Sequence, residues 1–234
     1  MKILAIDTTA KTVAAALCED LSLLGEITVN AKNTHSEAML PAVERLLGAF
    51  SMTPRDVDLF AVTCGPGSFT GVRIGAATVK GLAMRDTGDT PVPVASVSTL
   101  EALTYNFFGM GSETEPFIVV PAMDARRSQV YTAAFLLSGG KPERLMEDSA
   151  LSLEELAEKL AGLSQDRRLY FVGDGYDLTS EYFSGTEHGL NIKETPFSLR
   201  WPRGSSVAAC GYYAYLRGEA IDEGTLVPTY LRGL

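Results

Sequence analysis

Residues 2–18 read KILAIDTTAKTVAAALC, and the architecture predicted for the whole chain follows from this stretch. Two runs of strand-forming residues, 2–7 and 12–18, flank the turn residues 8–11, a pattern typical of two strands joined by a turn. A third run of this kind follows at residues 25–30. We therefore predict an antiparallel meander of three strands at the beginning of the chain.

The meander leads into a predicted helix. Thr34 and Glu37 form a Thr-x-x-Glu capping box, after which apolar residues recur at helical spacing as far as Phe50. This pattern predicts a helix over residues 35–50 with an early bend at Pro41. The other elements of the first half complete the order β-β-β-α-β-α-β-α: a buried strand over 59–64, a helix over 70–85, a strand over 91–95, and a helix capped by Ser98 and Glu101 that ends at Phe107.

The chain is predicted to form two lobes. Residues 109–115 are polar, contain glycine and end before Pro116, which is typical of a domain boundary. We therefore expect an N-terminal lobe of residues 1–110 and a C-terminal lobe of residues 111–234. The elements predicted for the second lobe are strands over 117–123, 128–137 and 169–172, a helix capped by Ser152 and Glu155, and a last helix at about 205–217, whose packing back onto the first lobe stays open.

The composition is that of a globular protein. Of the 234 residues, 46% are apolar and 21% are charged, and there is no run of about 18 apolar residues that would span a membrane. Asp7 stands where a signal peptide needs a long apolar stretch, so we expect a cytoplasmic location. The formal net charge of −9 repels phosphate backbones, so a nucleic acid in the pathway of this protein would be held by another component.

Cysteine and histidine give no pattern for a metal or a nucleophile. The three cysteines have no C-x-x-C spacing, and we interpret them as buried apolar residues. Positions three and four after His35 hold Ala38 and Met39, so no metal pair is predicted on that helix. A catalytic cysteine would need His35 or His188 as its base, and neither stands in a nucleophile motif. We therefore assign no metal ligand and no catalytic residue.

Asp7, Thr8 and Thr9 end the first predicted strand. A turn at this point can present a carboxylate, two hydroxyl groups and backbone amides to a phosphate. The alternative is a hairpin turn that is merely polar, and these three residues alone favour that alternative.

A second loop, residues 65–73, reads GPGSFTGVR between a predicted strand and a predicted helix. Free backbone N–H groups and the helix dipole favour an anion at such a point. The loop matches neither a Walker loop nor Gly-x-Gly-x-x-Gly. Gly65, Gly67 and Ser68 therefore either contact a phosphate or serve only the tight turn and the packing of the helix, and the two interpretations stand equal.

Residues 124–131, which read DARRSQVY, join two predicted strands of the second lobe. Arg126 is a candidate for a phosphate contact, whereas a solvated hairpin tip is the simpler interpretation. The apolar faces of helices 35–50 and 70–85 also have two interpretations. They are ordinarily core, but together they could leave a surplus stripe for a partner helix.

Several stretches together resemble the bacterial TsaB (YeaZ) family of tRNA threonylcarbamoyladenosine biosynthesis proteins. Residues 65–73 and 124–127 are specific to that family, whereas Asp7-Thr8-Thr9 is shared with a wider fold class. The resemblance implies a two-lobed α/β fold of the actin-like and sugar-kinase-like (ribonuclease H-like) class. The matching stretches span nearly the whole chain: 3–9, 34–37 with 40–41, 62–75, 124–131 and 228–232.

The resemblance also implies a function and partners. Members of the family act in the attachment of a threonylcarbamoyl group to the adenosine 3′ of the anticodon in certain tRNAs. They bind a catalytic paralogue, TsaD, recruit the ATPase TsaE, form homodimers when alone, and meet tRNA only through the complex. The partner interface that the resemblance implies lies on the first two helices and comprises His35, Met39, Leu40, Val43, Leu47, Val72, Arg73 and Val79.

A non-catalytic scaffold or activating subunit is the role that the resemblance implies. The metal-binding histidine pair of the paralogue falls on Ser96 and Leu100, and leucine has no ligand atom. The nucleotide loop of the paralogue falls near residues 124–128, where this chain has bulkier, charged residues. No cofactor of its own is implied, while ATP or ADP could bind at the interface with a partner. The alternatives are a peptidase or small ATPase of the same fold, and a purely structural homodimer.

Overall fold

The structure is a computed structural model that describes residues 1–30, 35–86, 89–184 and 188–231. The chain forms two compact units, each built on one five-stranded sheet, which confirms the predicted α/β fold. Unit 1 combines Met1–Ala102 with Pro202–Thr229, and unit 2 combines Leu103–Trp201 with the residues from Tyr230 onward.

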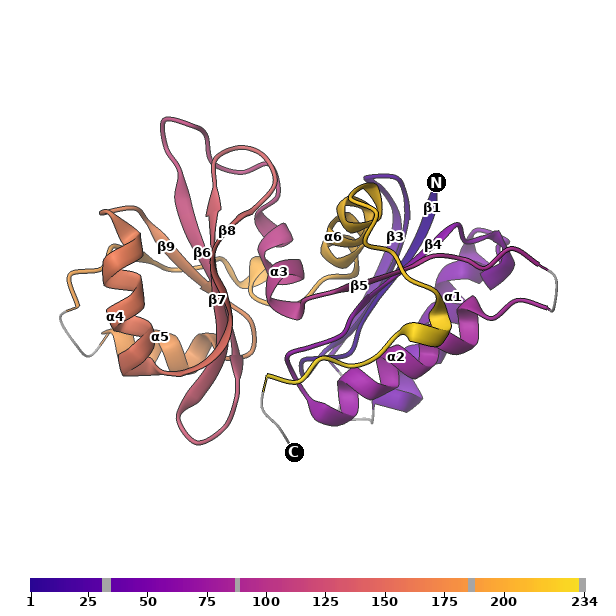
Figure 1. Cartoon of the computed structure of the whole chain (residues 1–234), viewed down its shortest axis with the longest axis horizontal. Coiled ribbons are helices and arrows are strands. Elements are labelled where there is room, and N and C mark those ends of the chain that lie inside the picture. Colours follow the sequence, from indigo (N-terminus) through magenta and orange to yellow (C-terminus); the bar gives the residue numbers. More distant parts are fainter. Residues whose placement is uncertain (31–34, 87–88, 185–187, 232–234) are drawn as a thin grey trace. The chain divides into compact units, whose positions relative to one another are not determined.

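The sheet of unit 1 contains the predicted meander (Figure 1). Its strands lie in the order β3-β2-β1-β4-β5, with antiparallel pairing between β1, β2 and β3 and parallel pairing from β1 to β4 and from β4 to β5. The strands are β1 (Lys2–Asp7), β2 (Val13–Glu19), β3 (Ser22–Val29), β4 (Leu59–Thr63) and β5 (Val94–Val97).

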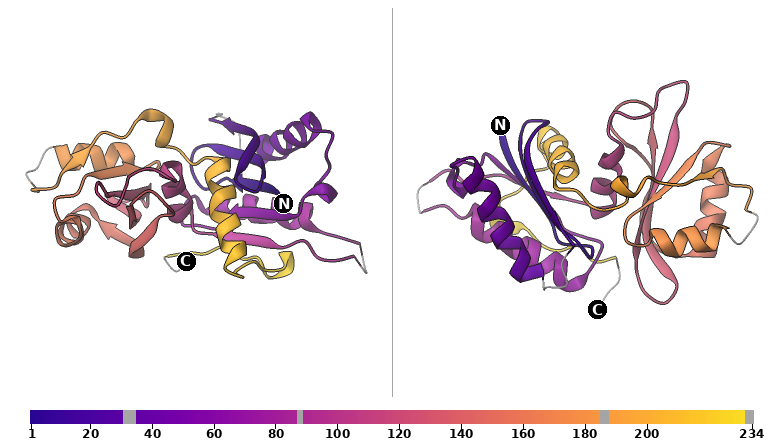
Figure 2. Two further views of the ribbon diagram at one scale, coloured as in Figure 1. Left: turned by 90° about the horizontal axis from the view of Figure 1, so that it is seen from above. Right: turned by 180° about the vertical axis from the view of Figure 1, so that it is seen from behind.

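Three helices cover this sheet. Helices α1 (His35–Ala49) and α2 (Phe69–Ala83) pack on one face, and α6 (Gly204–Leu216) packs on the other (Figures 1 and 2). The helices predicted over 35–50 and 70–85 are thus confirmed, and Pro41 lies within α1. Thr34, predicted as part of the cap, lies outside the described residues.

The predicted division of the chain at residue 110 needs correction. Residues 202–229, predicted for the C-terminal lobe, belong to unit 1 because α6 packs on β1, β2, β4 and β5. A Cβ atom at Gly211 would lie 2.5 Å from the Cβ atom of Ala61, so the helix backbone lies directly on the sheet. The open question about the last helix is settled by this contact.

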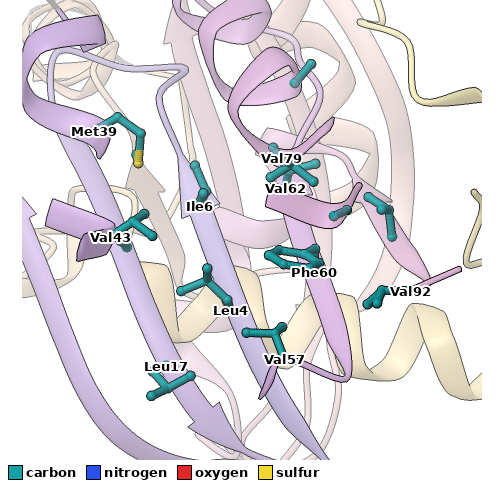
Figure 3. Close-up of a cluster of buried hydrophobic side chains, with 14 of the residues drawn as sticks. Leu4, Ile6, Leu17, Met39, Val43, Val57, Phe60, Val62, Val79 and Val92 are labelled. Atoms are coloured by element: carbon teal, nitrogen blue, oxygen red, sulfur yellow. The ribbon is translucent and has the colours of Figure 1, made fainter. Parts of the chain in front are cut away.

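The main core of unit 1 lies between the sheet and the pair α1 and α2. Figure 3 shows side chains from both layers turned toward one another, among them Leu4, Ile6 and Phe60 from the strands and Met39 and Val79 from the helices. Each of these five exposes 1% or less of its surface. Burial of each such side chain contributes about 1.5–3 kcal/mol, which holds both helices on the sheet.

Unit 2 has a mixed sheet in the order β10-β9-β6-β7-β8. Strands β9, β6, β7 and β8 are labelled in Figure 1. Helices α4 (Leu153–Ser164) and α5 (Tyr176–Ser184) bury Leu156, Leu160 and Phe183 against it. Ser152 and Glu155 form the predicted capping box of α4. The strands are β6 (Phe117–Asp124), β7 (Gln129–Leu137), β8 (Glu143–Ser152), β9 (Leu169–Val172) and β10 (Ile192–Lys193).

Several elements differ from the prediction. Strand β5 begins at Val94 rather than at residue 91, because Pro91 and Pro93 have no N–H group to donate to a neighbouring strand. The helix capped by Ser98 is α3 (Thr99–Thr104), followed by a 3₁₀ turn that ends at Phe107. The sequence pattern predicts none of β8, α5 and β10, because β8 and α5 lack a clear apolar period and β10 is only two residues long.

Within the described ranges, every helix is too short or too polar to cross a membrane.

Replacement of Gly211 by alanine tests the contact of α6 with the sheet. We expect Gly211→Ala to lower the free energy of unfolding by about 1–3 kcal/mol, because the new methyl group overlaps Ala61 and the helix must shift. Urea unfolding followed by circular dichroism measures this change. The control is Gly48→Ala in α1, where a Cβ atom meets nothing within 4 Å and stability should stay equal or rise slightly. Equal effects of the two substitutions would contradict the close packing of α6.

Candidate functional site

Two predicted site segments meet at the carboxyl ends of β1 and β4. These strands are parallel neighbours, so the β1–β2 turn and the loop before α2 leave the same edge of the sheet. The Ser68 backbone N–H donates to the Thr9 carbonyl oxygen at 2.8 Å, and Thr8 Oγ1 donates to the Gly71 carbonyl oxygen at 2.7 Å. We call this arrangement of residues 7–9 and 65–71 the glycine-loop site.

The glycine-loop site is closely packed. A Cβ atom at Gly71 would lie 1.9 Å from the Thr8 carbonyl oxygen, and one at Gly67 would lie 2.6 Å from the Thr9 carbonyl oxygen. Both contacts are with backbone, which cannot move aside as a side chain can. The glycines therefore let the first turn of α2 lie directly against the β1–β2 turn, so packing is a role that these residues do perform.

Asp7 is completely buried at the centre of the site. Its carboxylate accepts hydrogen bonds from Thr63 Oγ1 at 2.6 Å, from Thr9 Oγ1 at 2.9 Å and from the Thr9 backbone N–H at 3.1 Å. Burial raises the pKa of Asp7 above its ordinary value, and these three bonds offset only part of that effect. Asp7 is thus a buried acid held by threonine hydroxyl groups.

The polar groups predicted to contact a phosphate already make hydrogen bonds within the protein. The side-chain oxygens of Asp7, Thr8 and Thr9 are buried and bonded inside the protein. Ser68 is exposed, and its hydroxyl accepts a hydrogen bond from the Gly71 backbone N–H at 3.2 Å as the N-cap of α2. A phosphate at this point would have to displace several of these bonds, and the predicted contact stays a prediction.

Arg126 lies in unit 2, on the turn between β6 and β7. Its backbone N–H donates to Asp124 Oδ1 at 2.7 Å, and its guanidinium lies 3.3 Å from Asp124 Oδ2. Asp174 Oδ1 in turn accepts a hydrogen bond from the Asp124 backbone N–H at 3.0 Å. Arg126, Arg127 and Ser128 all have left-handed backbone conformations. The turn is therefore held by Asp124 and by Asp174, which follows β9, and Arg126 is paired with Asp124.

The predicted partner interface needs correction. Five of its eight residues expose 3% or less of their surface: Met39, Val43, Leu47, Val72 and Val79. All of these except Val72 belong to the core between the helices and the sheet. The reason is that apolar residues at helical spacing mark the face that a helix turns to its own core. These five cannot contact a partner while the unit is folded.

The other three predicted interface residues reach the surface in different ways. Leu40 is 46% exposed, while His35 is half-buried with Nε2 at 2.7 Å from the Ala10 carbonyl oxygen. Arg73 is exposed and lies over the ring of Phe69, 3.8 Å from its centre. Only Leu40 and Arg73 are thus available on the outside of their helices.

The outer surface of α2 carries a row of four residues, of which the sequence analysis named Arg73 and missed the other three. Arg73, Ala77 and Gly81 of α2 follow one another at intervals of four residues, and Met84, the C-cap residue directly after the helix, follows three residues later. All four are exposed. A Cβ atom at Gly81 meets nothing within 4 Å, so the middle of this row is open. We call these four residues the α2 outer row. The small residues at this spacing were the signal that could have revealed it.

Within the described part of the chain, no three His, Cys, Asp or Glu side chains gather in a way that could hold a metal ion. Leu100, onto which one histidine of the paralogue falls, is fully buried. The thiols of Cys18 and Cys64 are buried as well, and burial raises the pKa of Cys64 and raises that of Cys18 to about 11. A thiol with a raised pKa is a poor nucleophile.

Comparison with known sequences gives a consistent set of relatives. The family model described as "TsaD: tRNA N6-adenosine threonylcarbamoyltransferase" matches residues 23–232. The tRNA threonylcarbamoyladenosine biosynthesis protein TsaB of Bacillus subtilis (strain 168) is 34% identical, over 99% of this chain and 94% of that protein. The TsaB protein of Escherichia coli (strain K12) is 29% identical, over 99% of this chain and 95% of that protein.

Solved structures agree with these relatives. A Pseudomonas aeruginosa protein described as uncharacterized, with similarity to peptidase YEAZ, superposes with a TM-score of 0.78 at 27% identity and covers 99% of both chains. YeaZ from the same organism superposes with a TM-score of 0.74 at 26% identity, over 98% of this chain and 99% of the other. The similarity runs through both units.

The raised pKa of Asp7 predicts a pH dependence of stability. Above about pH 3.8 the unfolded chain ionises Asp7 before the folded chain does, so the folded state binds more protons and the free energy of unfolding falls as pH rises toward the folded pKa. Asp7→Asn removes the contribution of Asp7 to the pH dependence of the unfolding free energy. We therefore expect the difference in unfolding free energy, parent minus variant, to decrease with rising pH, as measured by urea unfolding between about pH 3 and 7.

Glu26 supplies a control of opposite sign. Burial acts to raise its pKa, but hydrogen bonds from the Ser205 backbone and the Arg203 guanidinium outweigh burial and hold the pKa below its ordinary value. Stability from Glu26 is lost as pH falls through its folded pKa, so the difference between parent and Glu26→Gln should increase with rising pH. If the two differences in unfolding free energy changed with pH in the same direction, the pKa directions assigned to Asp7 and Glu26 would be refuted.

Proposed function

This chain belongs to the TsaB (YeaZ) family, and we propose that it acts in tRNA threonylcarbamoyladenosine biosynthesis as a binding subunit rather than as the enzyme. The full-length similarity to TsaB proteins carries this proposal. Its role is to bind and activate a catalytic protein of the TsaD type, which transfers the threonylcarbamoyl group to the adenosine 3′ of the anticodon. The family model that matches this chain bears the name of that transferase, which supports a paralogous partner.

The α2 outer row is the surface that we propose for this partner. Arg73 and Met84 provide long side chains at its two ends, and Ala77 and Gly81 between them allow the backbone of another helix to approach closely. The distance between packed helices depends on the size of the side chains at the contact. Leu40 on α1 and Phe69 at the start of α2 add exposed apolar surface on the same two helices. A helical partner therefore suits this surface.

Further features of the assembly belong to the same proposal. When the chain is alone, a second copy takes the place of the catalytic protein on α1 and α2. The ATPase TsaE joins the complex, and the place for ATP or ADP is an interface with a partner. The net charge of −9 supports contact with tRNA only through the complex. The assembly works in the cytoplasm.

An enzyme of the same fold is the alternative, and one of the similar solved structures is described by its similarity to a peptidase. The two histidines, His35 and His188, lie in different units, and His35 is engaged with the Ala10 carbonyl oxygen. The buried thiols with raised pKa values are unsuited to attack a peptide. These observations favour the binding subunit.

Substitution in the α2 outer row tests the proposed interface. Ala77→Arg places a long charged side chain where a partner helix would pack, and we expect it to raise the dissociation constant for the TsaD-type protein of the same organism at least about tenfold. Isothermal titration calorimetry and co-elution in gel filtration measure binding. The matched control is Ala161→Arg, at an exposed position of α4, which should bind as the parent does.

The same pair of variants gives a cellular test. A strain without the gene should lack threonylcarbamoyladenosine in its tRNA, and the parent gene and Ala161→Arg should restore it while Ala77→Arg should not. Normal modification in the strain without the gene, or normal binding by Ala77→Arg, would be incompatible with the proposal in its present form.

Purified protein should show no turnover of its own. We expect neither a peptide library nor ATP to be hydrolysed above the background of a mock purification. Among the described residues no three His, Cys, Asp or Glu side chains gather as a metal site, and burial raises the pKa of the Cys18 and Cys64 thiols. Mass spectrometry of the peptides and a phosphate-release assay measure these activities. Turnover that survives repeated purification would establish the enzyme as the correct alternative.

A further inference from the structure

We propose that residues 221–229, which we call the C-terminal strap, position helix α2 for partner binding. The inference rests on the proposed function and assigns a role to part of the tail that the sequence analysis matched to the family but left without one. The strap follows α6 and runs beside α2 (Figure 1). It ends at the glycine-loop site, and all of it belongs to unit 1.

The strap begins at the edge of the unit 1 sheet. The Val94 backbone N–H donates to the Ile221 carbonyl oxygen at 2.8 Å, and the Ile221 N–H donates to the Val94 carbonyl oxygen at 2.9 Å. These two hydrogen bonds form an antiparallel bridge at the free edge of β5. The path of the following residues toward α2 therefore starts from a rigid point.

The middle of the strap holds the second half of α2. Leu226 is 1% exposed and belongs to the same core as Val79 and Ala83 of the helix. The 3₁₀ turn before it, Glu223–Thr225, packs against α2, and Lys80 Nζ lies 3.4 Å from the Gly224 carbonyl oxygen. Lys80 and Gly81 are neighbours, so this contact lies one residue from the α2 outer row.

The end of the strap holds the loop that leads into α2. The Thr229 backbone N–H donates to the Cys64 carbonyl oxygen at 2.7 Å. A Cβ atom at Gly65 would lie 2.3 Å from the Thr229 carbonyl oxygen, so the strap passes directly over this glycine. The Gly65 carbonyl oxygen in turn accepts the Thr99 backbone N–H at 2.9 Å. The start of α2 is therefore fixed between the strap and α3.

Residues 227–229 differ from the rest of the strap in how they contribute. Val227 is 65% exposed and Thr229 is exposed as well, so their burial stabilises the fold little. They contact the loop in two ways: the Thr229 backbone N–H donates to the Cys64 carbonyl oxygen, and Thr229 lies over Gly65. Removal of these three residues should consequently leave unit 1 folded while it releases the loop and with it the orientation of α2.

Two shortened chains isolate this effect and are compared with the full chain. The first ends at Thr229 and keeps every strap contact. The second ends at Leu226, so it differs from the first only by the loss of residues 227–229. We expect the chain that ends at Leu226 to bind the TsaD-type protein at least about tenfold more weakly than the chain that ends at Thr229. The melting temperatures should agree within a few degrees.

Amide hydrogen exchange gives a readout that does not need the partner. The backbone N–H of Ser68, in the loop before α2, donates a hydrogen bond to the Thr9 carbonyl oxygen. In the chain that ends at Leu226 this amide should exchange at least about tenfold faster than in the chain that ends at Thr229, because the loop opens locally. Amides in the middle of β1 and β2 should exchange equally in both chains.

Gly65→Ala provides a coupled test. In the chain that ends at Thr229 the new methyl group meets the Thr229 carbonyl oxygen and should weaken partner binding. In the chain that ends at Leu226 this contact is absent, and only the left-handed backbone at Gly65, with φ of +114°, resists the substitution. The weakening caused by Gly65→Ala should therefore be clearly smaller in the shorter chain.

Several outcomes would overturn the inference. Equal partner affinity and equal Ser68 exchange in the two shortened chains would mean that residues 227–229 do not position α2. Unfolding of the chain that ends at Leu226 would mean that the end of the strap is ordinary core. If neither shortened chain nor the full chain binds the partner, the proposed function fails, and Ser68 exchange alone then decides whether the strap holds the loop.

Discussion

The contact between the Thr8 carbonyl oxygen and the backbone of Gly71 is the constraint on which the rest of unit 1 depends. Only a glycine leaves room for it, and it brings the first turn of α2 directly onto the turn that follows β1. The Thr8 hydroxyl is then bonded to the helix backbone, and Asp7 is shut away from water. Burial raises the pKa of that acid, and the close approach at Gly71 fixes the start of α2.

In unit 1 the carboxyl ends of the strands and the outer surface of α2 have different roles. The carboxyl ends of parallel strands are where open α/β sheets commonly hold ligands. Here that region holds the protein's own groups, since threonine hydroxyls surround Asp7 and the tail crosses Gly65. The outside of α2 is left exposed, with two small residues in its middle. A closely packed interior and an open helix surface fit the proposed role as a binding subunit.

Much of the fold could be predicted from the sequence, because alternation, helical spacing, short apolar runs and capping residues mark the main strands and helices of the first hundred residues. The path of α6 could not, since its apolar residues and its glycines do not say which sheet it covers. The partner of Asp7 was equally hidden, because Thr63 lies 56 positions away along the chain. The site was predicted in part. The turn at Thr8 and the loop at Gly67 do meet, whereas apolar spacing led to Val43 and Val79, which form core.

The return of the chain to unit 1 after unit 2 has a consequence for how the protein is made. On a ribosome, the meander and α1 and α2 emerge first, but one face of their sheet stays uncovered until α6 is synthesised more than a hundred residues later. Domains tend to fold as units during synthesis, and exposed apolar surface on an unfinished domain favours aggregation. Unit 2, whose main segment is continuous, can mature earlier. The nascent protein thus exposes one apolar face of the unit 1 sheet until α6 has been synthesised, and such a surface is one that chaperones bind.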